Sequence, residues 1–140
     1  MDSKIKPRGI RNNNPLNIRK GNNWIGERHP QSDKAFEEFQ SLEYGVRAAF
    51  LLLRKYMSGY HGLTRKFNTI NLIIRRWAPP TENSTKRYID YVSKDMGMDP
   101  NTRFDFKDKR TMCNLVAAMI KVECGQEIDR QIIESAYDMI

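Results

Sequence analysis

From Ser41 to the end of the chain, apolar residues recur at steps of three and four, and this spacing constrains the fold more than any other feature. Such spacing places apolar side chains along one face of a helix. The pattern is clearest between Ser41 and Gly59, where the serine is a typical N-cap and the glycine a typical stop. The chain is therefore expected to be mainly helical, with the apolar stripes forming its core.

Four further helices are expected after this first one. Proline disfavours the helical state in the residue before it, and glycine often ends a helix, so both residue types mark boundaries. Serine, threonine and aspartate mark the starts. The expected limits are Thr69 to Pro79, Ser84 or Thr85 to Gly97, Asp108 to Gly125, and Asp129 to the end of the chain.

The first forty residues show a different pattern. The run from Asn12 to Pro15 predicts a chain reversal, because asparagine tolerates left-handed dihedral angles and proline fixes its own φ. Short alternating or aromatic stretches follow at residues 16–19, 24–27 and 35–39, and these predict a small three-stranded β-flap. The expected fold class is therefore α+β, with about five helices and an N-terminal β-flap. Residues 1–8 are expected to form a flexible basic arm.

Size and composition set further bounds. A chain of 140 residues fits one domain, here residues 1–140. Its apolar stretches are far shorter than the roughly 20 residues that span a membrane. No apolar secretory region is present at the N-terminus. Two cysteines do not make a disulfide framework, and two isolated histidines do not predict a zinc site. No motif for a cofactor is found.

The charge balance points to an anionic partner. Twenty-four basic side chains against 17 acidic ones give a net charge of +7 and a pI near 9.5. Nucleic acid, bacterial wall polymers and a membrane surface all fit this charge. The basic residues are scattered along the sequence, which is more typical of a solvated surface than of one binding stripe.

One acid stands out in the expected helix that starts at Asp108. Glu123 closes the apolar run 115–122, just before Gly125. Burial disfavours the ionised form of a carboxyl group, so such a residue can stay protonated near neutral pH and act as a general acid. The alternative is that Glu123 simply ends an amphipathic helix and points into water.

Several segments resemble bacterial glucosaminidase and flagellar muramidase domains of the lysozyme-like superfamily, and phage-associated relatives of these domains. The similar segments are Asn13 to Arg19, Asn23 to Gly26, Phe36 to Phe39, the run from Trp77 to Asn83 with Tyr88, and the opening from Arg8 to Pro15. The resemblance extends from Gly9 to about Gly125. It implies a lysozyme-like domain that cleaves the glycan strands of peptidoglycan.

The order of these segments departs from that family. There, a Glu-Ser-Gly element at the end of a hydrophobic helix precedes the asparagine-rich strand, whereas here the similar element is Glu123-Cys124-Gly125, near the other end of the chain. The resemblance therefore implies a circularly permuted domain with Glu123 as the catalytic acid. The helix that ends at Glu123 must then fold back against residues 13–27.

The chemistry of glycoside cleavage would require further site residues around Glu123. Glu27 is the first candidate for a second carboxylate, with Glu37 and Glu38 as alternatives. A lytic transglycosylase would need Glu123 alone, with a hydroxyl of the sugar closing an anhydro ring. Aromatic rings commonly form the floor of sugar subsites. The expected substrate-binding residues are Trp77, Tyr88, Trp24, Tyr60, Asn17 and Glu82.

The expected partner is bacterial peptidoglycan, with phage virion components as possible further partners of a monomeric protein. Such a protein would be made in the bacterial cytoplasm and would act at the wall after delivery or release, or as part of a virion. Two alternatives stay open. One is a non-catalytic virion protein that keeps the lysozyme-like shell. The other, less favoured, is a nucleic-acid-binding module with Arg8, Arg11 and Arg19 in a basic arm.

Overall fold

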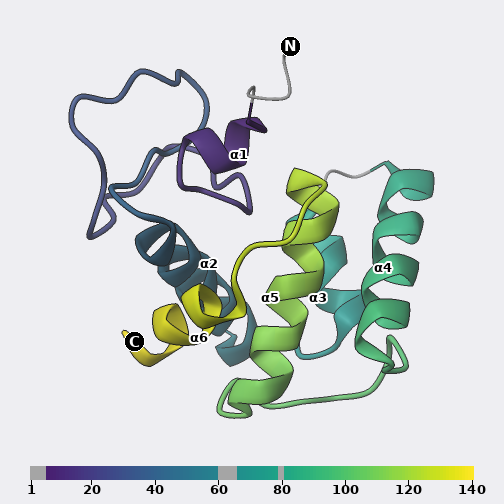
Figure 1. Ribbon diagram of the computed structural model, residues 1–140. Helices are drawn as coiled ribbons and strands as arrows, with labels where there is room; N and C mark the ends of the chain where they lie inside the picture. The colour runs from purple at the N-terminus through teal and green to yellow at the C-terminus, as the bar shows by residue number, and fades with distance from the viewer. Residues whose placement is uncertain (1–5, 60–65, 79–80) are drawn as a thin grey trace.

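The computed structural model describes residues 6–59, 66–78 and 81–140, without the side chains of residues 82 and 83. Six helices lie within these ranges (Figure 1). They are α1 (Arg8–Arg11), α2 (Leu42–Ser58), α3 (Ile70–Trp77), α4 (Glu82–Met96), α5 (Lys109–Cys124) and α6 (Arg130–Asp138). The prediction of a mainly helical chain is confirmed.

The capping residues explain where most helices begin and end. The side chains of Ser41, Thr69, Asp108 and Asp129 each accept a hydrogen bond from a backbone N–H in the first turn of the helix that follows. Left-handed glycines end α2, α4 and α5, as the sequence predicts. These local signals fix the boundaries independently of the tertiary packing.

One helix boundary and one additional helix differ from the prediction. Helix α4 begins at Glu82, with Thr81 at its N-cap, and not at the predicted Ser84 or Thr85. The sequence did not indicate this start because the first turn is polar and carries no apolar spacing. The four-residue helix α1 was not predicted, since so short a segment shows no periodicity. Arg8, which the sequence assigns to a flexible arm, is the first residue of α1.

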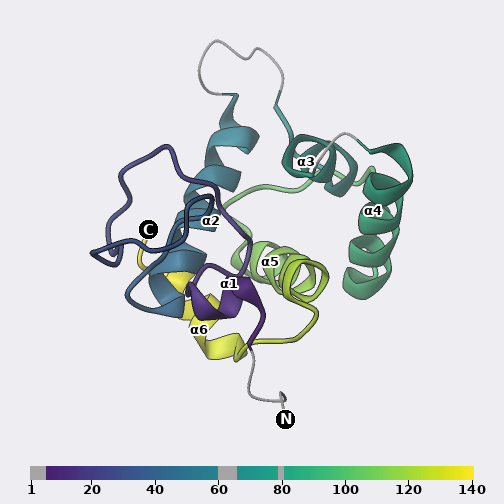
Figure 2. The ribbon, with the colours of Figure 1, turned by 90° about the horizontal axis from the view of Figure 1, so that it is seen from above.

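Helix α5 lies at the centre of the fold. It contacts α4 on one side and α6 on the other, and α1 lies against its C-terminal end (Figures 1 and 2). Eight of its residues are buried. The apolar faces of α2, α3, α4 and α6 complete the core around it. The start of the described chain therefore meets the end of α5 that carries Glu123, whereas α6 brings the last residues to the other end of α5, where Asp138 pairs with Lys109.

The predicted β-flap is wrong as a set of strands. Within the described residues the segment 12–41 contains only two isolated antiparallel bridges, Arg19 with Phe36 and Glu27 with Phe39. The stretch 35–39 pairs briefly with residues 18–20 and then with residues 26–28. The alternating pattern thus predicted which stretches meet, but each pairing is too short to form a strand.

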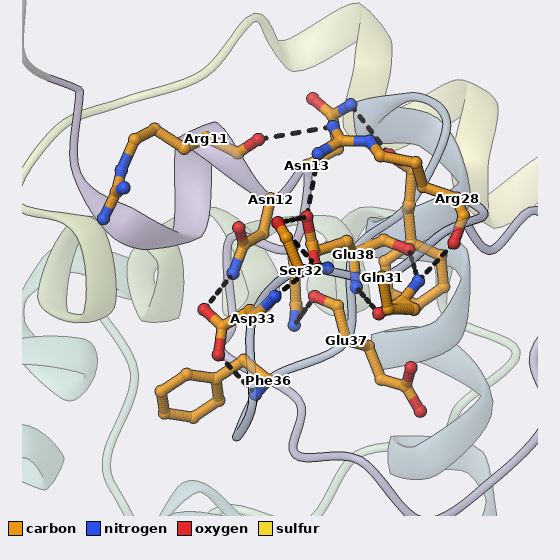
Figure 3. Close-up of polar contacts among 12 residues, drawn as sticks. Arg11, Asn12, Asn13, Arg28, Gln31, Ser32, Asp33, Phe36, Glu37 and Glu38 are labelled. Atoms are coloured by element: carbon orange, nitrogen blue, oxygen red, sulfur yellow. Dashed lines mark hydrogen bonds and ion pairs between the residues drawn. The ribbon is translucent and has the colours of Figure 1, made fainter.

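Side chains take over the role that a backbone ladder would have in this segment. The carboxylate of Glu38, 2% exposed, accepts hydrogen bonds from the backbone N–H groups of Ser32 at 2.5 Å and Asp33 at 2.6 Å (Figure 3). It also pairs with Arg28 at 3.1 Å, and Gln31 hydrogen-bonds the Glu38 backbone on both sides. Burial raises the pKa of Glu38, but these hydrogen bonds outweigh it and hold the pKa below its usual range.

Asp33 ties the same loop to α1. Its two carboxylate oxygens each accept a hydrogen bond of 2.6 Å from the Arg8 guanidinium. Asn12 and the backbone N–H groups of Ala35 and Phe36 also donate to this carboxylate. The hydrogen bond with Arg8 is the main reason that the pKa of Asp33 lies far below its usual range.

The asparagine cluster forms the predicted reversal. Asn13 and Asn17 adopt left-handed conformations, with φ of 53° and 54°. Buried Asn14 donates to the carbonyl oxygens of Ile18 and Glu37. The turn packs directly on α2 at Gly45, where a Cβ atom would collide with the Asn13 carbonyl group. A glycine at this point is therefore required for the turn to reach the helix.

Candidate functional site

Glu123 lies one residue before the end of α5, where the helix meets the asparagine turn. The Cys124 thiol next to it donates a hydrogen bond of 3.1 Å to the carbonyl oxygen of Pro15. Gly9 of α1 packs against the Cys124 sulfur so closely that a Cβ atom would come within 2.9 Å of it. The end of α5 therefore folds back against the start of the chain, as the permuted arrangement requires.

The Glu123 carboxyl group is held by two neutral donors from distant parts of the sequence. Asn17 Nδ2 donates to Oε1 at 3.1 Å, and the Tyr88 hydroxyl donates to Oε2 at 3.0 Å. Asn17 comes from the N-terminal turn and Tyr88 from the first half of α4. Both residues were predicted as substrate-binding; the structure places both in contact with the predicted acid, whose orientation they fix.

The electrostatics of the site shift the pKa of this carboxyl group upward. Burial raises the pKa of Glu123, and the hydrogen bonds from Asn17 and Tyr88 only partly offset this effect. Burial also raises the pKa of Tyr88, so its hydroxyl stays a donor, and it raises the pKa of Cys124 to about 11. A carboxyl group with a raised pKa and a fixed position has the properties of a general acid.

An open groove of about 540 Å³ lies between the first half of α4 and the end of α5. Its described lining residues are Ser84, Arg87, Tyr88, Tyr91, Lys121, Val122 and Glu123. Tyr91 and Val122 expose 44% and 37% of their surface. Glu123 therefore faces a groove that combines apolar surface with cationic groups.

The predicted second carboxylate, Glu27, lies elsewhere. It accepts a hydrogen bond of 2.8 Å from the Trp24 backbone N–H and lies near the side chain of Glu37. Burial, and then the charge of Glu27, raise the pKa of Glu37, whose carboxyl group points away from the network around Glu38 (Figure 3). No contact within the described residues joins Glu27 to Glu123.

Neither tryptophan is among the described residues that line the groove. Trp77 is half-buried at the end of α3 and packs edge-on against Tyr56, with ring centres 6.0 Å apart. Trp24 is half-buried against the core, and its indole nitrogen is buried without a described hydrogen-bond partner. Tyr60 and the side chain of Glu82 lie outside the described residues.

Tyr91, Arg87 and Ser84 are groove residues that the sequence analysis missed. Together with Tyr88 they occupy positions i, i+3, i+4 and i+7 of α4, which share one helix face. The helical spacing from Tyr88, a predicted substrate-binding residue, therefore indicates these three positions in the sequence. It was overlooked because Tyr91 at this spacing reads equally well as part of the apolar core stripe.

No group of three or more histidine, cysteine, aspartate or glutamate side chains among the described residues is arranged to hold a metal ion. None of the helices found there has both the length and the hydropathy needed to cross a membrane.

Comparison with known proteins places the chain among phage proteins. No family model matches it. Protein P5 of Pseudoalteromonas phage PM2 is 40% identical over 122 residues, which cover 84% of this chain and 71% of that protein. A similarity of this size and extent establishes common ancestry over most of both sequences. The chain therefore belongs to the family of the phage PM2 Protein P5.

Proposed function

We propose that this protein cleaves the glycan strands of bacterial peptidoglycan, with Glu123 as the general acid. The observation that carries the proposal is the Glu123 carboxyl group itself, which has a raised pKa, two fixed hydrogen bonds and access to a groove. The resemblance to lysozyme-like domains, in circularly permuted order, supports the same assignment. Membership of a phage family supports it further, because a phage must breach the wall of its host.

The groove favours a mechanism with one catalytic carboxyl group. Glu123 is the only carboxyl group among its described lining residues, whereas two-carboxylate glycosidases need both groups on either side of the scissile bond. In the one-acid mechanism Glu123 protonates the leaving glycosidic oxygen. A hydroxyl of the same sugar then attacks the anomeric carbon and gives its proton to the Glu123 carboxylate. The product is an anhydro sugar, and the acid is regenerated.

Asn17 and Tyr88 act in this scheme as positioning residues. Their hydrogen bonds stabilise the carboxylate that remains after proton donation. They also leave the carboxyl group one orientation relative to the groove. In Tyr88→Phe the ionised form loses one donor, so the pKa of Glu123 rises further and the alkaline limb of the pH–rate profile moves to higher pH.

Release of fragments from purified cell walls by wild type, Glu123→Gln and Glu127→Gln tests the proposal. Glu127 is an exposed acid four residues further on and serves as the matched control. We expect the wild type and Glu127→Gln to release fragments at equal rates, and Glu123→Gln to be slower by at least about 100-fold. Mass analysis of the fragments should find anhydro ends.

Two results would refute the proposal. Equal release by wild type and Glu123→Gln would remove Glu123 from the chemistry. No release by any of the three proteins would favour a non-catalytic phage structural protein with a lysozyme-like shell. Reducing ends in place of anhydro ends would retain Glu123 but replace the one-acid mechanism by hydrolysis.

A further inference from the structure

Arg87 is a cation of the groove that no group in the described part of the chain engages. It is exposed on α4, directly before Tyr88, and no ion pair or hydrogen bond joins it to any described residue. The other cation of the groove, Lys121, is already paired with Asp95 at 3.2 Å. Arg87 also makes no contribution to the pKa shift of Glu123, which burial, Asn17 and Tyr88 account for.

The neighbours of Arg87 define what it could bind. Tyr91, one turn further along α4, presents an exposed aromatic ring on the same face. A pyranose ring that stacks on Tyr91 would therefore have the Arg87 guanidinium beside one edge and the Glu123 carboxyl group further along the groove. A guanidinium binds a carboxylate with two parallel hydrogen bonds, which gives both strength and direction.

We propose that Arg87 binds a carboxylate substituent of the substrate sugar, so that the groove selects acidic glycan strands over neutral ones. This inference rests on the proposed function, because it assigns the substrate class of the same groove. Every second sugar of a peptidoglycan strand carries a lactyl ether that ends in a carboxyl group or in the peptide attached to it. Polymers of N-acetylglucosamine alone carry no such group.

Binding measurements on a non-cleaving background separate this inference from the cleavage itself. The protein is Glu123→Gln, and the probe is peptidoglycan glycan strands freed of their peptides, which expose the lactyl carboxylates. The matched probe is the same strands with these carboxylates converted to amides. We expect the first probe to bind about tenfold more tightly than the second, the difference that one charge-assisted hydrogen-bonded pair supports.

Substitution of Arg87 should remove this preference. In Glu123→Gln/Arg87→Gln both probes should bind with equal affinity, whereas Arg87→Lys should keep part of the preference. Arg110→Gln, at the exposed start of α5, is the control and should keep all of it. Arg87 is exposed, so its replacement is not expected to disturb folding.

Three results would overturn the inference. They are equal affinity of Glu123→Gln for the two probes, a preference that survives Arg87→Gln, and no binding of either probe. The proposed function fails differently, through unchanged wall cleavage in Glu123→Gln or no cleavage by the wild type. A charge preference without cleavage would leave the assignment of Arg87 standing in a protein that binds the wall and does not cut it.

Discussion

The N-terminal segment, residues 6–41, and the helical body, residues 42–140, are held together by different forces. In the body, apolar side chains from five helices pack into one core. The segment contributes three apolar side chains to that core, Leu16, Ile18 and Phe39. Its loops are fixed by polar or charged groups, with buried Asn14 and Glu38 and half-buried Asp33 at their centre. The site lies where the two regions meet, and Asn17 and Glu123 contribute one residue from each.

This difference suits a site that needs a positioned polar donor. A helix places side chains on faces set by its period, whereas a loop fixed by side-chain hydrogen bonds can deliver a donor such as Asn17 from a left-handed backbone. The cost is that the loop depends on a few ionisable groups. The segment should therefore respond to charge and pH, and the body to the loss of apolar volume.

The largest effect is expected in the body. Phe50 is fully buried and contacts the ring of Tyr137 edge-on at 5.3 Å. Phe50→Ala should lower the free energy of unfolding by about 3–5 kcal/mol, measured by urea denaturation. Ile25→Ala in the N-terminal segment is the control, because Ile25 is 63% exposed, and should change stability by less than about 0.5 kcal/mol. Equal losses would contradict the burial of Phe50 in the core and the exposure of Ile25.

At low pH the N-terminal segment should lose its structure before the helical body does. The folded pKa values of Asp33 and Glu38 lie below the usual range. Their contribution to stability is therefore complete above the unfolded pKa, about 4, and is lost as the pH falls through the folded values. Between about pH 4 and pH 2, amide NMR signals of residues 28–39 should broaden or shift before helical circular dichroism falls. Simultaneous loss of both signals would argue against separate stabilisation.

Removing one of these two charges should have a smaller effect. Glu38→Gln keeps the shape of the side chain but weakens its bonds to Arg28 and to the backbone of Ser32 and Asp33. We expect a loss of about 2 kcal/mol, with faster hydrogen exchange confined to residues 28–39. Glu127→Gln, at an exposed position, should show neither change. Faster exchange throughout α5 would mean that Glu38 supports the body as well.

The smallest of these effects concerns the contact between the regions. In an exposed helix Gly→Ala stabilises by about 1 kcal/mol, but a Cβ atom at Gly45 would collide with the Asn13 carbonyl group. Gly45→Ala should therefore destabilise the protein by about 1–2 kcal/mol. Arg54→Ala, at an exposed position of the same helix, is the control. A more stable Gly45→Ala variant would contradict the close packing of the asparagine turn on α2.

The same comparison explains what the sequence could predict. Helix boundaries depend on neighbours in sequence, so Ser41, Thr69, Asp108 and the glycines after α2, α4 and α5 were found in advance. The N-terminal segment depends on contacts between residues far apart in sequence, such as Arg8 with Asp33. No local sequence pattern predicts such contacts. Its alternating stretches were therefore interpreted as strands.

The candidate site, too, has a part that the sequence predicts and a part that depends on contacts between distant residues. Glu123 and its return to the start of the chain followed from the order of the similar segments. The partners of the acid did not, because hydrogen bonds such as that between Tyr88 and Glu123 join positions far apart in sequence. Aromatic residues are ambiguous for a further reason, because the same side chain suits a sugar subsite or a core. Trp24 and Trp77 were predicted for a subsite and are found packed against the core.

The central claim is that burial raises the pKa of the Glu123 carboxyl group while Tyr88 and Asn17 hold it in place. Titration of this carboxyl group by ¹³C NMR, assigned with Glu123→Gln, tests the claim most directly. The account predicts a pKa above the ordinary glutamate value of about 4.3 and a further rise in Tyr88→Phe, which lacks one donor to the carboxylate. A pKa at or below the ordinary value, or one that Tyr88→Phe leaves unchanged, would contradict it.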